Sequence, residues 1–298
     1  MMTVQQVFRS GLIAIIGRPN VGKSTLLNQL IGQKLSITSR KAQTTRHRIL
    51  GIRSEAQAQY IFVDTPGLQY KYRSGLHSAM QRVIGQSLQQ VDVVMLVMDA
   101  RQFTAQDKAV LALLPSNKPV ILVLNKVDLI SDKASLLPHM AMLAKCAVFH
   151  AIVPLSAAKN QKIDVLLAAL HPLLPYQERL YPEEQITDRS ERFLAAELVR
   201  EKIFRLLGDE LPYATTVVID KFEEHARYYR IFVSIIVHRN SHKGVLIGKH
   251  GEKLKQIASR ARCDMQRLFA RQVYLEVWVK VRQGWFDDGA LIRDYGYD

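Results

Sequence analysis

The sequence has few of the features that mark secreted, membrane-spanning or metal-rich proteins. Its 298 residues include only two cysteines, Cys146 and Cys263, which lie far apart. This excludes a disulfide framework or a cysteine-based zinc site, and we expect both thiols to be buried as small hydrophobes in a reducing compartment. No apolar run approaches the roughly 18 residues of a membrane span, so neither a signal sequence nor a transmembrane helix is expected.

Acidic residues are scarce relative to basic ones. The chain holds 41 Lys and Arg against 27 Asp and Glu, a formal net charge of +14. Such a balance favours an anionic partner, either a nucleic acid or a phospholipid surface. Part of the excess is concentrated in residues 239–271, where nine basic residues face only Glu252 and Asp264.

What the chain does have is an alternation of short apolar runs and helical patterns between residue 11 and about residue 171. The runs hardly alternate with polar residues, which is typical of strands buried on both faces of a parallel sheet. They cover 12–16, 59–64, 91–99, 119–125 and 149–156. We therefore predict an α/β domain with a mostly parallel sheet over residues 1–175.

The pattern changes after this domain. Residues 176–190 carry charge and Pro182 without a periodic apolar face, and we interpret them as a linker. An amphipathic helix, two strands, a glycine-rich turn, a long helix over 252–271 and a half-exposed strand over 272–281 follow. Residues 191–298 are therefore predicted to form a smaller α+β domain with a C-terminal tail.

The stretch GRPNVGKS, residues 17–24, matches the phosphate-loop pattern G-x-x-x-x-G-K-[ST] between a buried strand and a helix. Backbone N–H groups and the helix N-terminus can surround a β-phosphate there, and Gly17 and Gly22 permit its close approach. Lys23 is expected to reach the β- and γ-phosphates, and Ser24 to ligate Mg²⁺.

Three later stretches follow strands and favour a guanine nucleotide. Asp64 ends one strand, where a carboxylate can hold Mg²⁺ through water, and the Gly67 N–H can meet the γ-phosphate. Asp128, in VLNKVDL, is a pure acceptor that pairs with guanine N1–H and N2–H₂, and burying it unpaired would penalise ATP. The Ala157 N–H, in PLSAAKN, is the expected donor to guanine O6. The predicted nucleotide-contacting residues are Gly17, Arg18, Pro19, Asn20, Val21, Gly22, Lys23, Ser24, Thr25, Asp64, Thr65, Pro66, Gly67, Asn125, Lys126, Val127, Asp128, Ser156 and Ala157.

In this order the motifs resemble those of the translation-factor-like GTPases, and KAQTTRHR (41–48) with DTPGL resembles the Era subgroup. The resemblance implies a GTPase that uses GTP, GDP and Mg²⁺. It assigns a Mg²⁺ ligand to Thr45, with Thr44 as the alternative. The catalytic residues are then Lys23, Thr45, Asp64 and Gly67, and the metal-binding residues are Ser24, Thr45 and Asp64, the last through water.

Two positions bear on the rate of hydrolysis. Leu68 stands where Ras-like proteins carry a water-positioning glutamine, so we expect slow intrinsic hydrolysis. Related GTPases with asparagine at the position of Asn20 use K⁺, which makes K⁺ stimulation a hypothesis. The alternative for Asn20, a loop residue that hydrogen-bonds its own backbone, stays open.

A second motif, IGKHG, places a G-x-x-G directly before the helix at 252–271. Alone it is weak evidence, because a turn is the default explanation of two glycines at this spacing. Its position between two helices, after a strand pair and before a strand, resembles a type II KH domain, which binds single-stranded RNA. A solvated helix face is the alternative interpretation of the charge around it. The predicted RNA-binding residues are Lys243, Ile247, Gly248, Lys249, His250, Gly251, Lys253, Lys255 and Arg260.

The resemblance also implies partners and a location. An Era-type protein is expected to be a cytoplasmic monomer that binds the 3′ end of 16S rRNA during assembly of the 30S subunit. The alternative is a GTP-binding scaffold peripheral to the anionic inner membrane, which does not need the G-x-x-G. A P-loop kinase is a third hypothesis, and Asn125 and Asp128 argue against it.

Overall fold

The computed structural model describes residues 8–39, 41, 44–67, 85–208 and 211–295. Contacts between residues divide the chain into two compact units. Within the described ranges, the first unit holds 8–36, 47–67 and 85–188, and the second holds 37–46 and 189–295. The second unit thus includes a short segment, 37–46, that the sequence placed in the first domain.

The first unit is built on a six-stranded sheet with the order β2-β3-β1-β4-β5-β6. Only β2 is antiparallel to its neighbour, so the prediction of a mostly parallel sheet is confirmed. The strands are β1 (Arg9–Ile16), β2 (Ile49–Ser54), β3 (Ala58–Asp64), β4 (Val93–Asp99), β5 (Val120–Asn125) and β6 (Ala151–Pro154). Every residue of β3, β4 and β5 is buried, as their unbroken apolar runs require.

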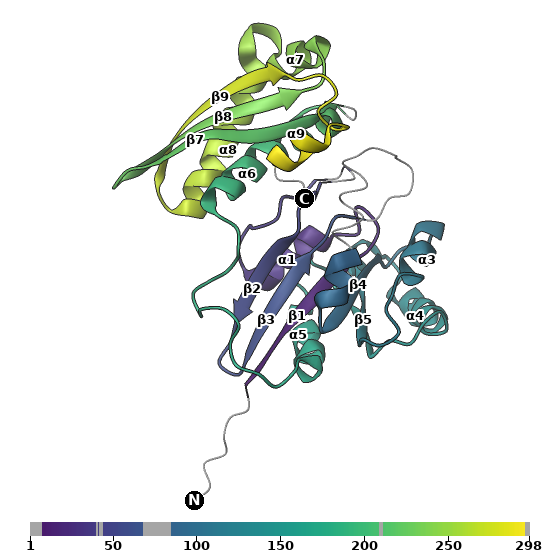
Figure 1. Cartoon of the computed structure of the whole chain (residues 1–298). Helices are drawn as coiled ribbons and strands as arrows, with labels where there is room; N and C mark the ends of the chain where they lie inside the picture. The colour runs from purple at the N-terminus through teal and green to yellow at the C-terminus, as the bar shows by residue number, and fades with distance from the viewer. Residues whose placement is uncertain (1–7, 40, 42–43, 68–84, 209–210, 296–298) are drawn as a thin grey trace, which may run out of the picture. The chain divides into compact units, whose positions relative to one another are not determined.

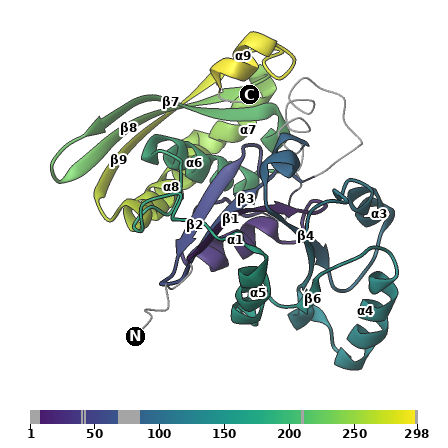
Figure 2. The ribbon, with the colours of Figure 1, turned by 60° about the horizontal axis from the view of Figure 1, so that its bottom comes forward.

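Helices cover both faces of this sheet. They are α1 (Lys23–Ile31), α3 (Ala105–Leu111), α4 (Leu136–Ala144) and α5 (Ile163–Leu170), and residues 85–90 are also helical. Val110 of α3 and Leu143 of α4 pack with Ala14 and Ile16 of β1 in one core cluster. Figure 2 shows α3 and α4 on one side of the sheet and α5 on the other. The helices therefore leave the carboxyl ends of the central strands uncovered, and the loops that carry the sequence motifs lie there.

The predicted linker is attached to the sheet. The Ile52 N–H of edge strand β2 donates to Ile186 O (2.8 Å), and Thr187 Oγ1 donates to Leu50 O (2.7 Å). These bonds occupy part of the outer edge of β2, an edge that would otherwise offer unpaired backbone groups.

The second unit is a three-stranded sheet covered on one face by two helices (Figure 1). Strands β7 (Thr215–Glu224), β8 (Tyr228–Val237) and β9 (Gln272–Val281) follow in that order, with β8 and β9 parallel. The helices are α6 (Glu191–Leu206), α7 (Asn240–Ile247), α8 (Glu252–Phe269) and α9 (Gly289–Asp294). Alternate residues of β8, such as Ile231 and Val233, pack with Leu198 of α6 and Met265 of α8. The predicted α+β class of this domain is confirmed.

Two features differ from expectation. Cys146 and Cys263 are both exposed rather than buried in the core. The described part of the C-terminal tail packs on the sheet: Trp285, which is fully buried, and Ile292 of α9 lie against Ile236 of β8, on the sheet face away from α6 and α8. The described helices include no candidate for a membrane-spanning segment.

Candidate nucleotide and RNA sites

The phosphate loop leads directly into α1. Gly22, at φ 100°, is the residue before the helix, and a Cβ there would lie 2.3 Å from Asn125 Nδ2. Only glycine therefore fits between the loop and β5. The Lys23 ammonium is buried and donates to Gly17 O (2.9 Å) and Arg18 O (3.0 Å). Burial lowers the pKa of Lys23 to about 8, although Asp64 opposes the shift.

Ser24 and Asp64 meet at the carboxyl end of β3. Ser24 Oγ donates to Asp64 Oδ2 (3.0 Å), and Ser36 Oγ donates to the same oxygen (2.9 Å). Hydroxyl and carboxylate oxygens are the ligands that Mg²⁺ prefers, so this pair fits the metal that the sequence predicts. A Cβ at Gly67 would lie 3.1 Å from Lys23 Nζ, which puts the Gly67 backbone beside the lysine.

Asn125 joins three loops at the carboxyl end of β5. Its Nδ2 donates to Val21 O (2.8 Å), and its Oδ1 accepts from the N–H groups of Lys126 (2.8 Å) and Ala157 (2.9 Å). The Ala157 N–H, which the sequence assigned to guanine O6, is thus engaged by Asn125. Asn125 therefore positions the loops that carry Lys126 and Ala157 against the phosphate loop.

The Asp128 carboxylate lies on the three-residue turn Val127–Leu129 and is exposed. Ser156 Oγ donates to Asp128 Oδ1, so Ser156 orients the predicted guanine acceptor. The penalty that the sequence argument placed on ATP assumed a buried, unpaired carboxylate. Water can reach this one, so the expected discrimination is smaller.

Asp99, which ends β4 at the same edge of the sheet, was not among the predicted site residues. Its carboxylate is 1% exposed and accepts from Lys126 Nζ (2.9 Å) and from Arg101 Nε and Nη2 (2.9 and 2.7 Å). Lys126 Nζ also donates to Asn20 O in the phosphate loop (2.6 Å). Burial alone would raise the pKa of Asp99, but the hydrogen bonds from Arg101 and Lys126 hold it well below its usual range. The rule that found Asp64 and Asn125, a polar residue closing a buried strand, would have found Asp99 as well.

Arg18 of the phosphate loop is held from α3. Its Nε lies 3.1 Å from both oxygens of Asp107, and Asp107 also closes a capping box with Thr104 at the start of that helix. The Arg18 side chain is 11% exposed. This geometry makes Arg18 a structural support for the loop.

The remaining predicted contacts lie in the same loops. The Thr65 hydroxyl donates to Ile15 O (2.9 Å) and is buried, so it supports β1 instead of facing a ligand. Asn20 has a left-handed backbone, with φ 64°. Pro19, Val21 and Thr25 belong to the phosphate loop and the first turn of α1, Pro66 follows β3, and Val127 opens the turn that carries Asp128. Leu68 lies outside the described residues.

The threonine predicted to ligate Mg²⁺, Thr45, lies in the segment 37–46 that packs with the second unit. Arg46 beside it is 2% exposed and donates to Thr215 O (2.9 Å) and Pro212 O (3.0 Å). Thr38 N–H donates to Glu201 Oε1 of α6 (3.1 Å). Metal ligation by Thr45 stays a prediction, and Thr44 instead donates its hydroxyl to Lys41 O (2.7 Å).

The G-x-x-G loop joins α7 to α8. Gly248, at φ 73°, lies where a Cβ would come within 2.8 Å of the Lys253 Cβ, and Gly251 has φ 79°. Lys249 and His250 between them are exposed, as are Lys255 and Arg260 on α8. Lys243, Ile247 and Lys253 are partly buried beside the loop, whereas Leu246 and Ile257, also considered for a base groove, are fully buried in the core.

A phosphate loop before a helix, a paired Ser24 and Asp64, and an oriented Asp128 define a P-loop nucleotide-binding domain, and the second unit has the KH arrangement. Family models agree: "50S ribosome-binding GTPase" matches residues 12–126, and "KH domain" matches residues 210–286. The protein is therefore a GTPase with a KH domain.

Comparison of whole chains identifies the family. GTPase Era of Nitrosomonas eutropha is 52% identical over 98% of both chains, and that of Chromobacterium violaceum is 48% identical over the same shares. Two solved structures are 40% identical over 97% of this chain and 99% of theirs. One is a variant of Aquifex aeolicus Era bound to GDP·AlF₄⁻ (TM-score 0.94), and the other is Era with MgGDPNP and nucleotides 1506–1542 of 16S ribosomal RNA (TM-score 0.93). The chain belongs to the GTPase Era family.

Proposed function

We propose that this GTPase binds the 3′ end of 16S rRNA through its KH domain and acts in assembly of the 30S subunit in the cytoplasm. The observation that carries the proposal is the loop Gly248–Gly251, which presents exposed Lys249 and His250 at the start of the basic helix α8. Backbone at positive φ lets such a loop approach phosphates closely, and the surrounding lysines neutralise them. A relative 40% identical to this chain was crystallised with nucleotides 1506–1542 of 16S rRNA.

The nucleotide site supplies the switch. Lys23 holds the β- and γ-phosphates, the Gly67 N–H meets the γ-phosphate, and Asp128 accepts from the guanine base. Ser24 and Thr45, with Asp64 through water, would hold Mg²⁺, which neutralises charge on the transferred phosphoryl group. Lys126 and Asn125 keep the base loop and the phosphate loop in register through Asn20 O and Val21 O.

The switch acts through the segment that holds Thr45. The γ-phosphate favours a conformation in which Thr45 lies at the nucleotide, whereas Arg46 and Thr38 tie the same segment to α6 and Thr215 in the second unit. GTP and GDP should therefore bias the RNA-binding unit differently, and hydrolysis ends the GTP state.

The test is binding of the purified protein to a panel of short single-stranded RNAs, loaded with either a GTP analogue or GDP. We expect preference for sequences from the 3′ end of 16S rRNA, an affinity that differs between the two nucleotides, and loss of binding in Gly251→Asp. Gly251 has open space around it, so the added carboxylate meets no neighbouring atom, but its φ of 79° strains any side chain, and thermal unfolding must verify that the variant keeps its fold. Equal binding of all RNAs, or RNA displaced by anionic vesicles, would contradict the proposal and favour a membrane-surface scaffold.

A further inference from the structure

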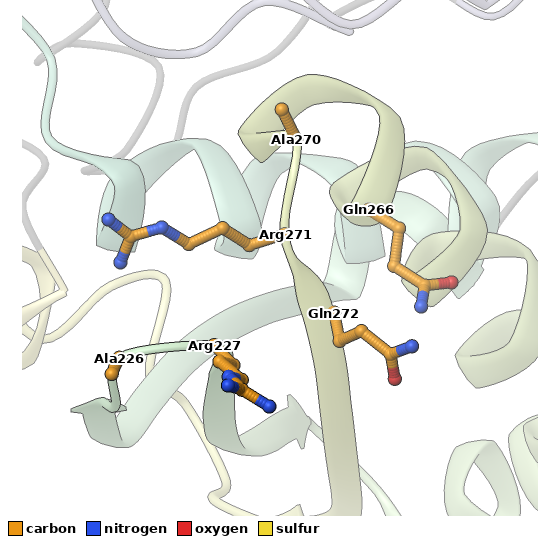
Figure 3. Close-up of a pocket in the computed structure, with 6 residues that line it drawn as sticks. All are labelled: Ala226, Arg227, Gln266, Ala270, Arg271 and Gln272. Atoms are coloured by element: carbon orange, nitrogen blue, oxygen red, sulfur yellow. The ribbon is translucent and has the colours of Figure 1, made fainter.

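A shallow pocket of about 510 Å³ lies at the end of α8 remote from the G-x-x-G loop. It is lined by Ala226, Arg227, Gln266, Ala270, Arg271 and Gln272 (Figure 3). Because α8 has 18 residues, about 27 Å of helix separates this pocket from the glycine loop. None of the predicted RNA-binding residues lines it.

The lining suits an anion. It contains two guanidinium groups and two carboxamides and no carboxylate. Arg271 has two contacts: its Nη1 bonds the exposed Glu224 Oε1 (2.6 Å), and its guanidinium lies 5.0 Å from the centre of the Tyr229 ring. Arg227 is exposed and forms no ion pair with any residue in the described ranges. A phosphate entering the pocket would meet Arg227 without displacing an acidic partner.

Aromatic rings adjoin the pocket on the sheet face away from α6 and α8. Tyr228 pairs in register with Gln272, and its ring lies 5.1 Å from that of Tyr274 and 4.4 Å from that of His225. Tyr274 is 56% exposed. Further along β9, Trp278 is 46% exposed and stacks on Phe232 (6.0 Å). Among residues 211–295, the Trp285 cluster covers this face around Ile236 and Val218.

The charges on this face are already balanced. Arg230 pairs with Glu276 (2.9 Å), and Lys280 with Asp220 (3.4 Å). The acidic residues beside the rings therefore present little repulsion to a polyanion, while Arg227 at the pocket supplies uncompensated positive charge. A groove with positive charge next to open aromatic rings is what single-stranded nucleic acid needs, one phosphate neutralised and the neighbouring bases stacked.

We propose that this pocket and the adjoining rings form a second contact for single-stranded RNA, with a backbone phosphate at Arg227 and Arg271 and a base on Tyr274. The proposal rests on the proposed RNA-binding function, because a G-x-x-G loop holds only about four nucleotides. A longer strand can engage the glycine loop and this face together. The contact adds affinity for long RNA and leaves binding of a minimal RNA unchanged.

The experiment compares two RNAs on the full-length protein by fluorescence anisotropy: a minimal strand of about four nucleotides that fills the glycine loop, and a strand several times longer that contains it. Tyr274→Ala should weaken the long strand roughly 5- to 150-fold, while Tyr274→Phe keeps the ring and binds as the parent protein does. Arg227→Ala should weaken the long strand and reduce the slope of its salt dependence by about 0.7. Lys145→Ala, which removes an exposed lysine at the end of α4 in the first unit with no ion pair in the described ranges, is the matched charge control and should change little.

The outcomes separate the two proposals. If Tyr274→Ala and Arg227→Ala weaken binding of the long strand and leave binding of the minimal strand unchanged, the second contact is supported. Unchanged binding of the long strand in both variants overturns it. It is also overturned if the two substitutions weaken binding to a protein of the small subunit and leave RNA binding unchanged. If Gly251→Asp leaves both strands bound, the failure lies with the proposed function of the glycine loop. Thermal unfolding of each variant verifies that the fold is retained, and the exposure of Tyr274 and Arg227 predicts that it is.

Discussion

Replacing Asp99 by Asn should weaken binding of guanine nucleotides without unfolding the protein. Asn keeps the shape of the side chain but removes the charge that orders Lys126 against the phosphate loop. A hydrogen bond to a charged group contributes about 1.5–3 kcal/mol and a neutral one about 0.5–1.5. Lys126 is 25% exposed, so water screens the pair, and we take the difference as about 1–2 kcal/mol. This corresponds to a roughly 5- to 30-fold increase in the Kd for GDP.

Calorimetric titration with GDP measures the effect, and Arg101→Ala is the control. Arg101 is the other partner of Asp99 and is 45% exposed, so its removal leaves the Lys126 contact in place and should change the Kd by less than about twofold. Asp99→Asn with the GDP affinity of the parent protein, or an Arg101→Ala variant that is equally impaired, would refute the argument that Asp99 acts through Lys126.

Three further predictions concern the same site. Asp128→Asn should shift preference from guanine to xanthine nucleotides, because a carboxamide donates to the xanthine C2 oxygen and repels the guanine amino group. The binding free energy of GDP should weaken by about 1.5–3 kcal/mol. Competition between GDP and XDP measures the preference, and an unchanged preference would contradict the prediction. Burial lowers the pKa of Lys23 to about 8, and bound phosphates favour its charged form. GDP binding should therefore take up a proton above about pH 8, and its affinity should fall as the pH rises. Calorimetry in buffers of different ionisation enthalpy measures this uptake, and finding none would contradict the prediction. Hydrolysis should be faster in K⁺ than in Na⁺, and Asn20→Ala should abolish the difference; equal rates of the parent protein in both salts would eliminate the K⁺ hypothesis.

Much of the fold could be predicted because strands buried on both faces of a parallel sheet appear in the sequence as unbroken apolar runs. The five unbroken apolar runs correspond to β1, β3, β4, β5 and β6. Strand β2, ILGIRS, was missed because Gly51 and Arg53 interrupt its pattern, and its outer edge is partly occupied by the linker at Ile186. The ordered tail around Trp285 was missed as well, because a single aromatic residue gives no periodic signal.

The site was harder to predict than the fold because sequence patterns identify residues but not their partners. The loops that carry Ser24, Asp64, Asn125 and Asp128 follow from motif spacing. The bond from Ala157 N–H to Asn125 and the exposure of Asp128 depend on how three loops meet, which spacing does not encode. The packing of 37–46 with the second unit likewise depends on long-range partners, such as Arg46 with Thr215, that no local pattern reveals.

Control of RNA binding by the bound nucleotide is tested most directly by the affinity of the full-length protein for a 16S rRNA 3′-end strand, measured in one buffer with a GTP analogue and then with GDP. A nucleotide-controlled switch requires different dissociation constants for the two loaded forms, and the difference should be lost in Gly251→Asp because binding itself is lost. Identical dissociation constants for the two forms of the parent protein would contradict it.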